Sequence, residues 1–258
     1  MTSGASTVRT DDNGWLPAAD VRTHRVGMSA SPTGRIPMRV AGPVGFDLDL
    51  TLINSRPAIM AAWSAVAEEL EVSIDLDEVD RRMGIKLEDE VAYWFPAPAQ
   101  SAAAASYRRH YVQLAPTLTF LLPGAAEALA SVRHAGERAV VITAKHPVSV
   151  EPSLAAVGLQ PDEVFSHVHG PEKAAVLARL SAAVYVGDTP ADMVAGLGGG
   201  ATAVGVPTGS FGPAELTNAG ASVILGSLAE FPEWYARFRS GPAHRVGWAD
   251  RCPEGRTP

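Results

Sequence analysis

The sequence predicts an α/β fold in which a doubly wound parallel sheet carries an inserted α-helical cap domain. From Pro123 onward, short apolar runs alternate with helical patterns, which is typical of a parallel sheet covered by helices on both faces. An isolated apolar run at residues 44–46 supplies the first strand. The block between these two regions contains helical patterns only, so we interpret it as an insertion.

The elements follow in order along the chain. In the insertion, a helix is expected from Ser55-Arg56-Pro57, and further helices over about 75–83, 86–94 and 100–115. Later strands are expected at 138–142, 164–165, 183–186, 201–206 and 222–225. The intervening helices are expected at 125–134, 148–157, 172–180 and 191–197, with a closing helix after the last strand. The core therefore comprises residues 41–54 and 119–239, and the cap comprises residues 55–118.

The two ends of the chain have a different composition from the rest. Residues 1–40 are rich in Thr, Ser, Gly, Pro and Arg and show no apolar periodicity. Such a segment buries too little apolar surface to offset the entropy of ordering. We expect a disordered arm over residues 1–40 and a similar tail over residues 240–258.

Composition limits the classes of function. The 258 residues are 47% hydrophobic, which is enough for one large domain with an insertion. A net charge of -7 argues against nucleic acid or an anionic membrane surface as a partner, and no apolar run approaches the roughly 18 residues of a membrane span. The single cysteine, Cys252, excludes an internal disulfide. With no evident secretory signal, a cytoplasmic location is expected.

Acidic residues directly follow the first predicted strand. Asp47 and Asp49 stand one residue apart after the apolar run, and Thr51 follows them. Burying unpaired carboxylates costs several kcal/mol or shifts their pKa until the charge is lost. Buried carboxylates usually face a metal ion or a reacting group that compensates this cost, so we expect the functional site at this turn.

Three later groups of polar residues also stand at strand ends or helix starts. Thr143 follows the run 139–142, Lys173 opens a helical pattern, and Asp188 and Asp192 follow the run 183–186. The carboxyl ends of parallel strands lie along one edge of a sheet, where ligands bind. These side chains should therefore converge although they are far apart in the sequence.

The set resembles the haloacid dehalogenase-like hydrolases, most closely the phosphoglycolate-phosphatase-like branch with a helical cap. Four segments carry the resemblance, which covers about residues 43–235: Phe46-Asp47-Leu48-Asp49-Leu50-Thr51-Leu52-Ile53-Asn54-Ser55, Ile142-Thr143-Ala144, Lys173 and Gly187-Asp188-Thr189-Pro190-Ala191-Asp192. It implies that Asp47 attacks the phosphorus of a phosphomonoester to form an aspartyl-phosphate. It also implies that Asp49 protonates the leaving alcohol and later helps to activate water.

A divalent cation is expected because an anionic carboxylate and an anionic phosphate repel each other. Mg²⁺ prefers oxygen ligands, and Asp47, Asp188 and the backbone carbonyl of Asp49 would suffice. Asp192 lies one helical turn after Asp188 and reaches the same cation or its waters, or else it caps the helix N-terminus.

Three residues are expected to bind the phosphate group of the substrate. The Thr143 hydroxyl and the Ala144 amide are candidate donors, although threonine is also a common strand residue. Lys173 is one of only three lysines, and its place in the first turn of a helix fits a phosphate clamp. Lys145 is equally explained as an exposed loop residue.

Two positions depart from the family pattern. Leu50 stands where glycine is common, and we expect its backbone not to need positive φ. Asn54 replaces a frequent aspartate, and its amide still caps the turn.

Candidates for substrate specificity lie mainly in the cap. Arg56, Arg82 and Lys86 are candidates to contact the part of the substrate beyond its phosphate, although Arg82 is also explained as part of a solvated face. His167 and His169 alternate on a possible strand and are expected to be surface residues, because two histidines do not make a zinc site.

The leading hypothesis is a Mg²⁺-dependent phosphatase acting on a small phosphorylated metabolite. The alternatives are phosphoglucomutase-like phosphoryl transfer between sugar positions and a non-catalytic phosphometabolite-binding protein. Fold resemblance fixes neither the substrate nor the oligomeric state.

Overall fold

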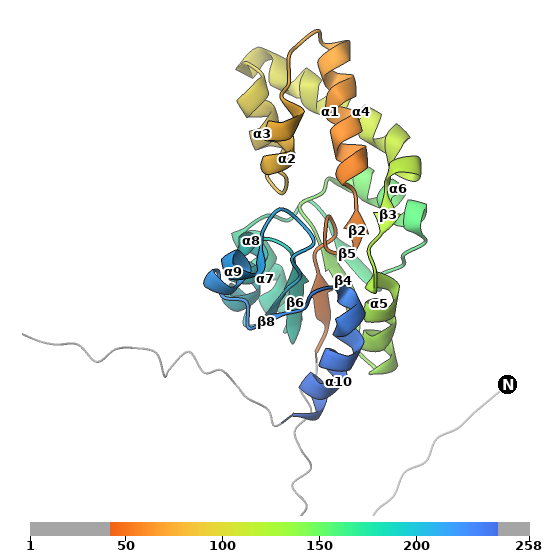
Figure 1. The fold of residues 1–258 in the computed structure, drawn as a ribbon, viewed down its shortest axis with the longest axis vertical. Coiled ribbons are helices and arrows are strands. Elements are labelled where there is room, and N and C mark those ends of the chain that lie inside the picture. The colour runs from red at the N-terminus through yellow and green to blue at the C-terminus, as the bar shows by residue number, and fades with distance from the viewer. Residues whose placement is uncertain (1–41, 242–258) are drawn as a thin grey trace, which may run out of the picture. The chain divides into compact units, whose positions relative to one another are not determined.

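A computed structural model describes residues 42–241 of the chain (Figure 1). The arm predicted over residues 1–40 lies outside the described residues, as does all but the start of the tail predicted over residues 240–258. The described part begins just before the first strand and ends one residue after the last helix.

The core contains a six-stranded parallel sheet with the order β5-β4-β1-β6-β7-β8. Its strands are β1 (Val44–Phe46), β4 (Ala139–Ile142), β5 (Glu163–Phe165), β6 (Val184–Gly187), β7 (Thr202–Gly205) and β8 (Val223–Ile224). β1 is central and pairs with β4 on one side and β6 on the other. The carboxyl ends of these three strands therefore lie next to one another, as the sequence predicts.

Helices cover both faces of this sheet, which confirms the doubly wound α/β class. The core helices are α5 (Ala125–His134), α6 (Pro147–Val157), α7 (Pro171–Leu180), α8 (Pro190–Gly198), α9 (Pro213–Asn218) and α10 (Phe231–Ser240), with a short 3-10 helix η1 (Leu228–Glu230) before the last. Residues of α5 and α10 pack on one face together with β1 and β6, whereas α7 and α8 pack on the other (Figure 1). Burial of alternate strand residues against both layers explains why the strands are apolar throughout.

Four helices form the insertion, which lies between β1 and α5. They are α1 (Arg56–Glu69), α2 (Leu76–Arg81), α3 (Leu87–Trp94) and α4 (Ala97–Leu118), and we call this block the cap. The cap has its own apolar cluster, in which Trp63, Val79, Val91 and Phe95 are buried. The division of the chain into a core and a cap at residues 55 and 118 stays a prediction.

Two short strands flank the cap and were not predicted. β2 (Ile53–Asn54) and β3 (Phe120–Leu121) pair antiparallel, so they join the two chain crossings between cap and core. Each has only two residues, which is too short to give an alternating pattern in the sequence. No helix within residues 42–241 is both long and apolar enough to span a membrane.

Candidate active site

Asp47 is held at the carboxyl end of β1 by the neighbouring strand. Its backbone N–H donates to the Val186 carbonyl at 2.8 Å, so the β1–β6 pairing continues one residue beyond the strand. The Asp47 side chain is buried. This pairing fixes the carboxylate beside the end of β6, where Asp188 follows.

The turn after Asp47 is tighter than the sequence suggests. Leu50 has a φ of +59°, so the expectation that its backbone avoids positive φ is wrong. Its N–H donates to the Ile53 carbonyl at 2.7 Å, and Thr208 donates a hydroxyl to the Leu50 carbonyl. These bonds and the burial of the Leu50 side chain hold a conformation that costs a non-glycine residue about 1–2 kcal/mol. The expected cap by Asn54 is present, because its side-chain oxygen accepts from the Arg56 N–H at 3.2 Å.

Lys173 lies between two carboxylates. Its Nζ is 2.7 Å from Asp47 Oδ1 and 2.7 Å from Asp192 Oδ1, and its side chain is only 9% exposed. Burial alone would lower the pKa of Lys173, but Asp192 and Asp47 outweigh it and raise the pKa well above its ordinary value. The ammonium is therefore permanently charged in the first turn of α7.

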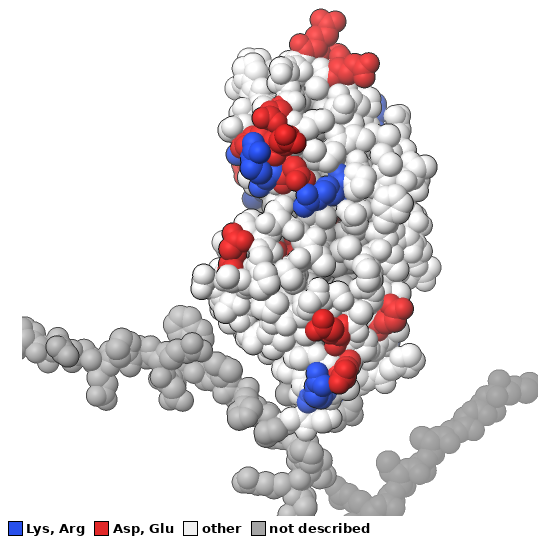
Figure 2. Space-filling view, in the orientation of Figure 1, with Lys and Arg blue, Asp and Glu red and all other residues white. Residues whose placement is uncertain are grey.

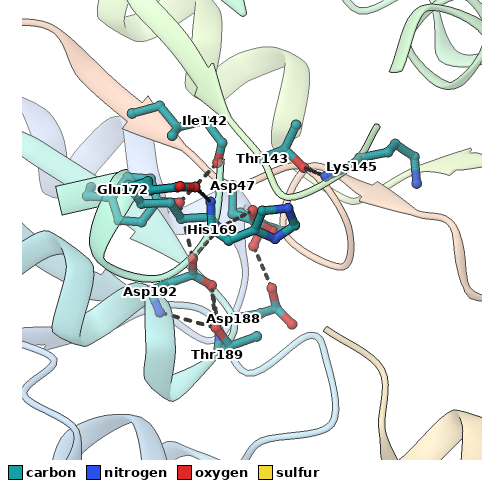
Figure 3. Close-up of polar contacts among 12 residues, drawn as sticks. Asp47, Ile142, Thr143, Lys145, His169, Glu172, Asp188, Thr189 and Asp192 are labelled. Atoms are coloured by element: carbon teal, nitrogen blue, oxygen red, sulfur yellow. Dashed lines mark hydrogen bonds and ion pairs between the residues drawn. The ribbon is translucent and has the colours of Figure 1, made fainter. Parts of the chain in front are cut away.

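Three buried carboxylates gather around that lysine. Oxygens of Asp47, Asp188 and Asp192 lie within 4.8 Å of one another, and Figure 3 shows the three side chains grouped at the strand ends. Burial raises the pKa of Asp47 to about 7, with Lys173 opposing and Asp192 adding to the rise. Burial also raises the pKa of Asp188 well above its usual range, and the Asp47 and Asp192 charges add to it. One ammonium does not neutralise three carboxylates, so the cluster fits a divalent cation held by oxygen ligands.

Asp192 caps a helix, which is one of the two roles that the sequence left open, and its contact with a cation stays a prediction. Its Oδ2 accepts from the Thr189 N–H at 3.2 Å, and its own N–H donates to the Thr189 hydroxyl oxygen at 3.2 Å, which forms a capping box at the start of α8. Its Oδ1 accepts from Lys173 and from the Tyr185 hydroxyl at 3.1 Å. It is thus a helix cap and a member of the acidic cluster.

Asp49 is positioned differently from the other acids. Its Oδ1 accepts from Ser55 Oγ at 2.5 Å and from Lys145 Nζ at 2.7 Å, and its side chain does not belong to the acidic cluster. The Lys145 side chain is 7% exposed and its Nζ lies 4.2 Å from the centroid of the Tyr111 ring. The alternative of an exposed loop residue is therefore wrong for Lys145. The rarity of lysine in the chain was the sequence feature that could have identified it.

Thr143 and Ala144 follow β4 and border the same site. Thr143 is buried, its N–H donates to the Phe165 carbonyl at 2.9 Å, and its hydroxyl oxygen accepts from the Lys145 N–H at 3.1 Å. Both residues line the cavity that Asp47 and Lys173 also line. Their expected role as phosphate donors stays a prediction.

A cavity of about 260 Å³ connects these residues with the cap. Arg82 and Lys86 line it, but Arg56 does not: Arg56 pairs with Asp80 at 2.7 Å. Arg82 pairs with Glu90 at 2.8 Å. Of the three specificity candidates, the structure brings two to the cavity.

A group of histidines lies on the cavity wall, which the sequence pattern does not predict. His146, His167 and His169 all line it. His167 is exposed as expected, but it follows β5 in a turn with φ of +58° and is not part of a strand. His169 is buried, so the expectation of a surface residue is wrong for it.

Surface charge does not form a single basic region on the face in Figure 2. Lysine and arginine side chains there lie beside aspartate and glutamate side chains, mostly over the cap. This mixture agrees with the negative net charge of the sequence.

The fold and the acidic strand ends define a class of α/β proteins in which a parallel sheet carries a helical insertion and buried carboxylates at its edge. The family model described as haloacid dehalogenase-like hydrolase matches residues 44–206. The chain belongs to the haloacid dehalogenase-like hydrolase family and is therefore an enzyme.

Individual relatives agree with this assignment. The chain is 28% identical over 217 residues to a plasmid-encoded phosphoglycolate phosphatase of Cupriavidus necator, covering 76% of this chain and 94% of that protein. Among solved structures, CbbY from Rhodobacter sphaeroides in complex with phosphate has a TM-score of 0.64 at 21% identity, covering 73% of this chain and 95% of that one. A hydrolase from Pseudomonas syringae has a TM-score of 0.65 at 20% identity, covering 76% and 99% of the two chains. The two structures share the fold with this chain.

Proposed function

We propose that the protein is a Mg²⁺-dependent phosphatase that hydrolyses a small phosphorylated metabolite through an aspartyl-phosphate on Asp47. The observation that carries the proposal is the buried Asp47 carboxylate beside Lys173 and Asp188, facing the cavity that Thr143 also lines. A carboxylate in contact with a fixed ammonium is oriented for attack, and the same ammonium can neutralise phosphate oxygens.

Asp47 and Asp49 have different roles in the proposed reaction: Asp47 is the nucleophile, and Asp49 is the acid and base. An Asp47 oxygen bonds to phosphorus while the bond from phosphorus to the alcohol oxygen breaks, and Asp49 gives its proton to that oxygen. Asp49 then takes a proton from water as the water oxygen attacks phosphorus, which releases inorganic phosphate and restores the Asp47 carboxylate. Such acid and base assistance contributes about 10²–10⁴ in rate.

Mg²⁺ fits the donor set of this site. Asp47, Asp188 and the Asp49 backbone carbonyl would hold it, with Asp192 reaching the ion or its waters. When bound, the cation supplies positive charge that lets the nucleophile and the phosphate approach each other. It also removes the excess negative charge of the acidic cluster.

Lys145 and Ser55 are positioning residues for Asp49 in this proposal. Both donate to Asp49 Oδ1, so Oδ2 is the oxygen that can face the leaving group. A carboxyl group with one fixed oxygen loses less rotational freedom when the substrate binds.

The substrate class is supported by the cavity and by one relative. A cavity of about 260 Å³ suits a small metabolite and not a polymer. Because the relative from Cupriavidus necator is named a phosphoglycolate phosphatase, phosphoglycolate is the first candidate. The single cysteine supports a cytoplasmic location.

A phosphate-release screen tests the proposal. The purified protein is assayed with Mg²⁺ against a panel of phosphorylated metabolites, with Asp47→Asn as the blank. Release from one or a few substrates far above the blank supports the proposal. If no phosphate is released, interconversion of sugar-phosphate isomers is assayed next, and such conversion would replace hydrolysis with phosphoryl transfer.

A further inference from the structure

A buried histidine on the cavity wall has an unsatisfied ring nitrogen. His169 is 8% exposed, and its Nε2 has no hydrogen-bond partner among residues 42–241. An unpaired buried polar atom is destabilising, because it has lost its hydrogen bonds to water without gaining others. Since His169 lines the cavity, a bound molecule is the natural partner for this nitrogen.

The neighbouring backbone fixes where that nitrogen lies. Beyond β5, the chain continues to pair with the segment after β4: His167 N–H donates to the Lys145 carbonyl at 2.9 Å, and Val168 N–H donates to the Thr143 carbonyl at 3.0 Å. The histidine segment therefore runs alongside the Thr143–Lys145 loop at the candidate phosphate site. Figure 3 shows His169 among the same side chains.

His169 is the inner member of a continuous row of rings. The His169 and His167 rings are 5.1 Å apart, and the His167 and His146 rings are 5.5 Å apart, centroid to centroid. His146 Nδ1 accepts from the Val148 N–H at 3.3 Å, so a neutral His146 carries its proton on Nε2 and can donate from it. The row thus offers more than one donor on the cavity wall.

The charges around the row favour an anion. Lys86 lines the cavity and forms no ion pair with another described residue. Burial lowers the pKa of His169, and the charges of Lys86 and His167 lower it further. Two acids lie nearby: Glu88 pairs with Arg108 at 2.5 Å, and Glu172 accepts from the His169 backbone N–H at 3.1 Å.

From this arrangement we propose that His169, with His146, His167 and Lys86, forms a second anion-binding subsite for the part of the substrate beyond its reacting phosphate. The inference rests on the proposed phosphatase function and narrows its substrates to phosphomonoesters that carry a further anionic group. A carboxylate or a second phosphate would supply the missing acceptor for His169. A charged hydrogen bond of this kind contributes roughly 1.5–3 kcal/mol, or at least about tenfold in affinity.

Binding to the Asp47→Asn variant with Mg²⁺ tests the subsite without turnover. 3-Phosphoglycerate carries a carboxylate where glycerol 3-phosphate carries a hydroxymethyl group. Fructose 1,6-bisphosphate carries a second phosphate that fructose 6-phosphate lacks. We expect the anionic member of at least one pair to bind at least about tenfold more tightly. The pair that shows the preference identifies the anion.

Substitutions at His169 then show whether this residue causes the preference for the anionic ligand. Added to Asp47→Asn, His169→Leu should reduce the preference to near one, and His169→Gln, which keeps an N–H donor, should retain most of it. His134→Gln, an exposed histidine outside the cavity, is the matched control. Circular dichroism checks that each variant is folded.

The subsite and the phosphatase proposal fail in different ways. No preference in either pair, no binding of any ligand, or a preference that survives His169→Leu would overturn the subsite. Absence of phosphate release by the unmodified enzyme would instead overturn the phosphatase, and the binding ratios would still decide the subsite.

Discussion

At the scale of single residues, the position of the Asp188 carboxylate depends on Thr51 and on the loop after β7. Its Oδ1 accepts from the Thr51 hydroxyl at 2.9 Å. A Cβ atom placed on Gly209 would overlap its Oδ2, so the loop after β7 passes too close to this carboxylate to carry a side chain. The loop thereby limits how far Asp188 can rotate away from Asp47 and Asp192.

Gly209→Ala should therefore damage the acidic cluster more than the fold. The added methyl group meets the end of a side chain and not backbone, so the Asp188 carboxylate can move and stability should change little. Changing a residue that supports a metal ligand costs about 10–100-fold in metal affinity or activity. The variant should therefore need a higher Mg²⁺ concentration than the unmodified enzyme. The measurement is phosphate release across a Mg²⁺ titration.

Gly212→Ala provides the control in the same loop, because a Cβ there meets its nearest atom at an ordinary 3.7 Å. Equal Mg²⁺ requirements in Gly209→Ala and in the unmodified enzyme would show that Asp188 does not hold the metal.

The site residues differ in how far the sequence could predict them. Asp47, Thr143, Lys173 and Asp188 stand directly at strand ends or a helix start, so the parallel-sheet rule alone brings them together. The Lys145–Asp49 pair depends on how two side chains turn within a loop, which no periodicity encodes. Likewise, the positive φ of Leu50 is imposed by contacts from residues distant in sequence, such as Thr208.

At the scale of elements, α4 of the cap is joined to α6 of the core by a buried hydrogen bond. Tyr111 and Ser153 hydroxyl oxygens are 2.9 Å apart, and Ser153 also donates to the Ser149 carbonyl at 2.7 Å. Ser153 has a single proton, so Tyr111 must donate to Ser153. The same tyrosine ring lies beside Lys145, which links this helix contact to the site.

Tyr111→Phe should lower the free energy of unfolding by about 1 kcal/mol, because it removes one donor while Ser153 keeps its bond to Ser149. Urea denaturation measures the difference. Tyr107→Phe makes the same change one turn earlier in α4, where no hydroxyl bond is formed to a described residue, and should have a smaller effect. Equal effects of both changes would contradict the assigned hydrogen bond.

The helices and strands also differ in how far the sequence could predict them. The order of core strands and helices followed from the alternation of short apolar runs with helical patterns, and the helical insertion followed from the lack of strand patterns. The pair β2–β3 was missed because two-residue strands carry no pattern. His169 was misjudged because it lies on a cavity wall with its ring against that of His167, an arrangement that no periodicity in the sequence encodes.

At the scale of the whole molecule, the acidic cluster makes stability depend on pH and on metal. The folded-state pKa of Asp47 is about 7 against an ordinary 3.8, and that of Asp188 is also raised. A raised carboxyl pKa contributes stability that is present below about pH 4 and is lost as pH rises through about 7. Without a cation, the ionised cluster therefore weakens the fold near neutral pH.

Mg²⁺ should consequently raise the melting temperature more at pH 8 than at pH 5.5. At the lower pH the cation must displace protons from Asp47 and Asp188, so its apparent affinity falls. Thermal denaturation with and without Mg²⁺ at both pH values gives the comparison. In Asp188→Asn the Mg²⁺ effect should be small at both. A Mg²⁺ shift of the same size at pH 5.5 and pH 8 would argue against a carboxylate metal site.

The central claim is that Asp47 carries the phosphoryl group during turnover. The most direct measurement is to quench the enzyme during turnover of its best substrate and locate any phosphoryl group by peptide mass spectrometry. We predict a hydroxylamine-sensitive acyl phosphate on the peptide containing Asp47, absent from Asp47→Asn and reduced when Mg²⁺ is removed. Sustained phosphate release by Asp47→Asn, or a phosphoryl group on another residue, would contradict the proposed mechanism.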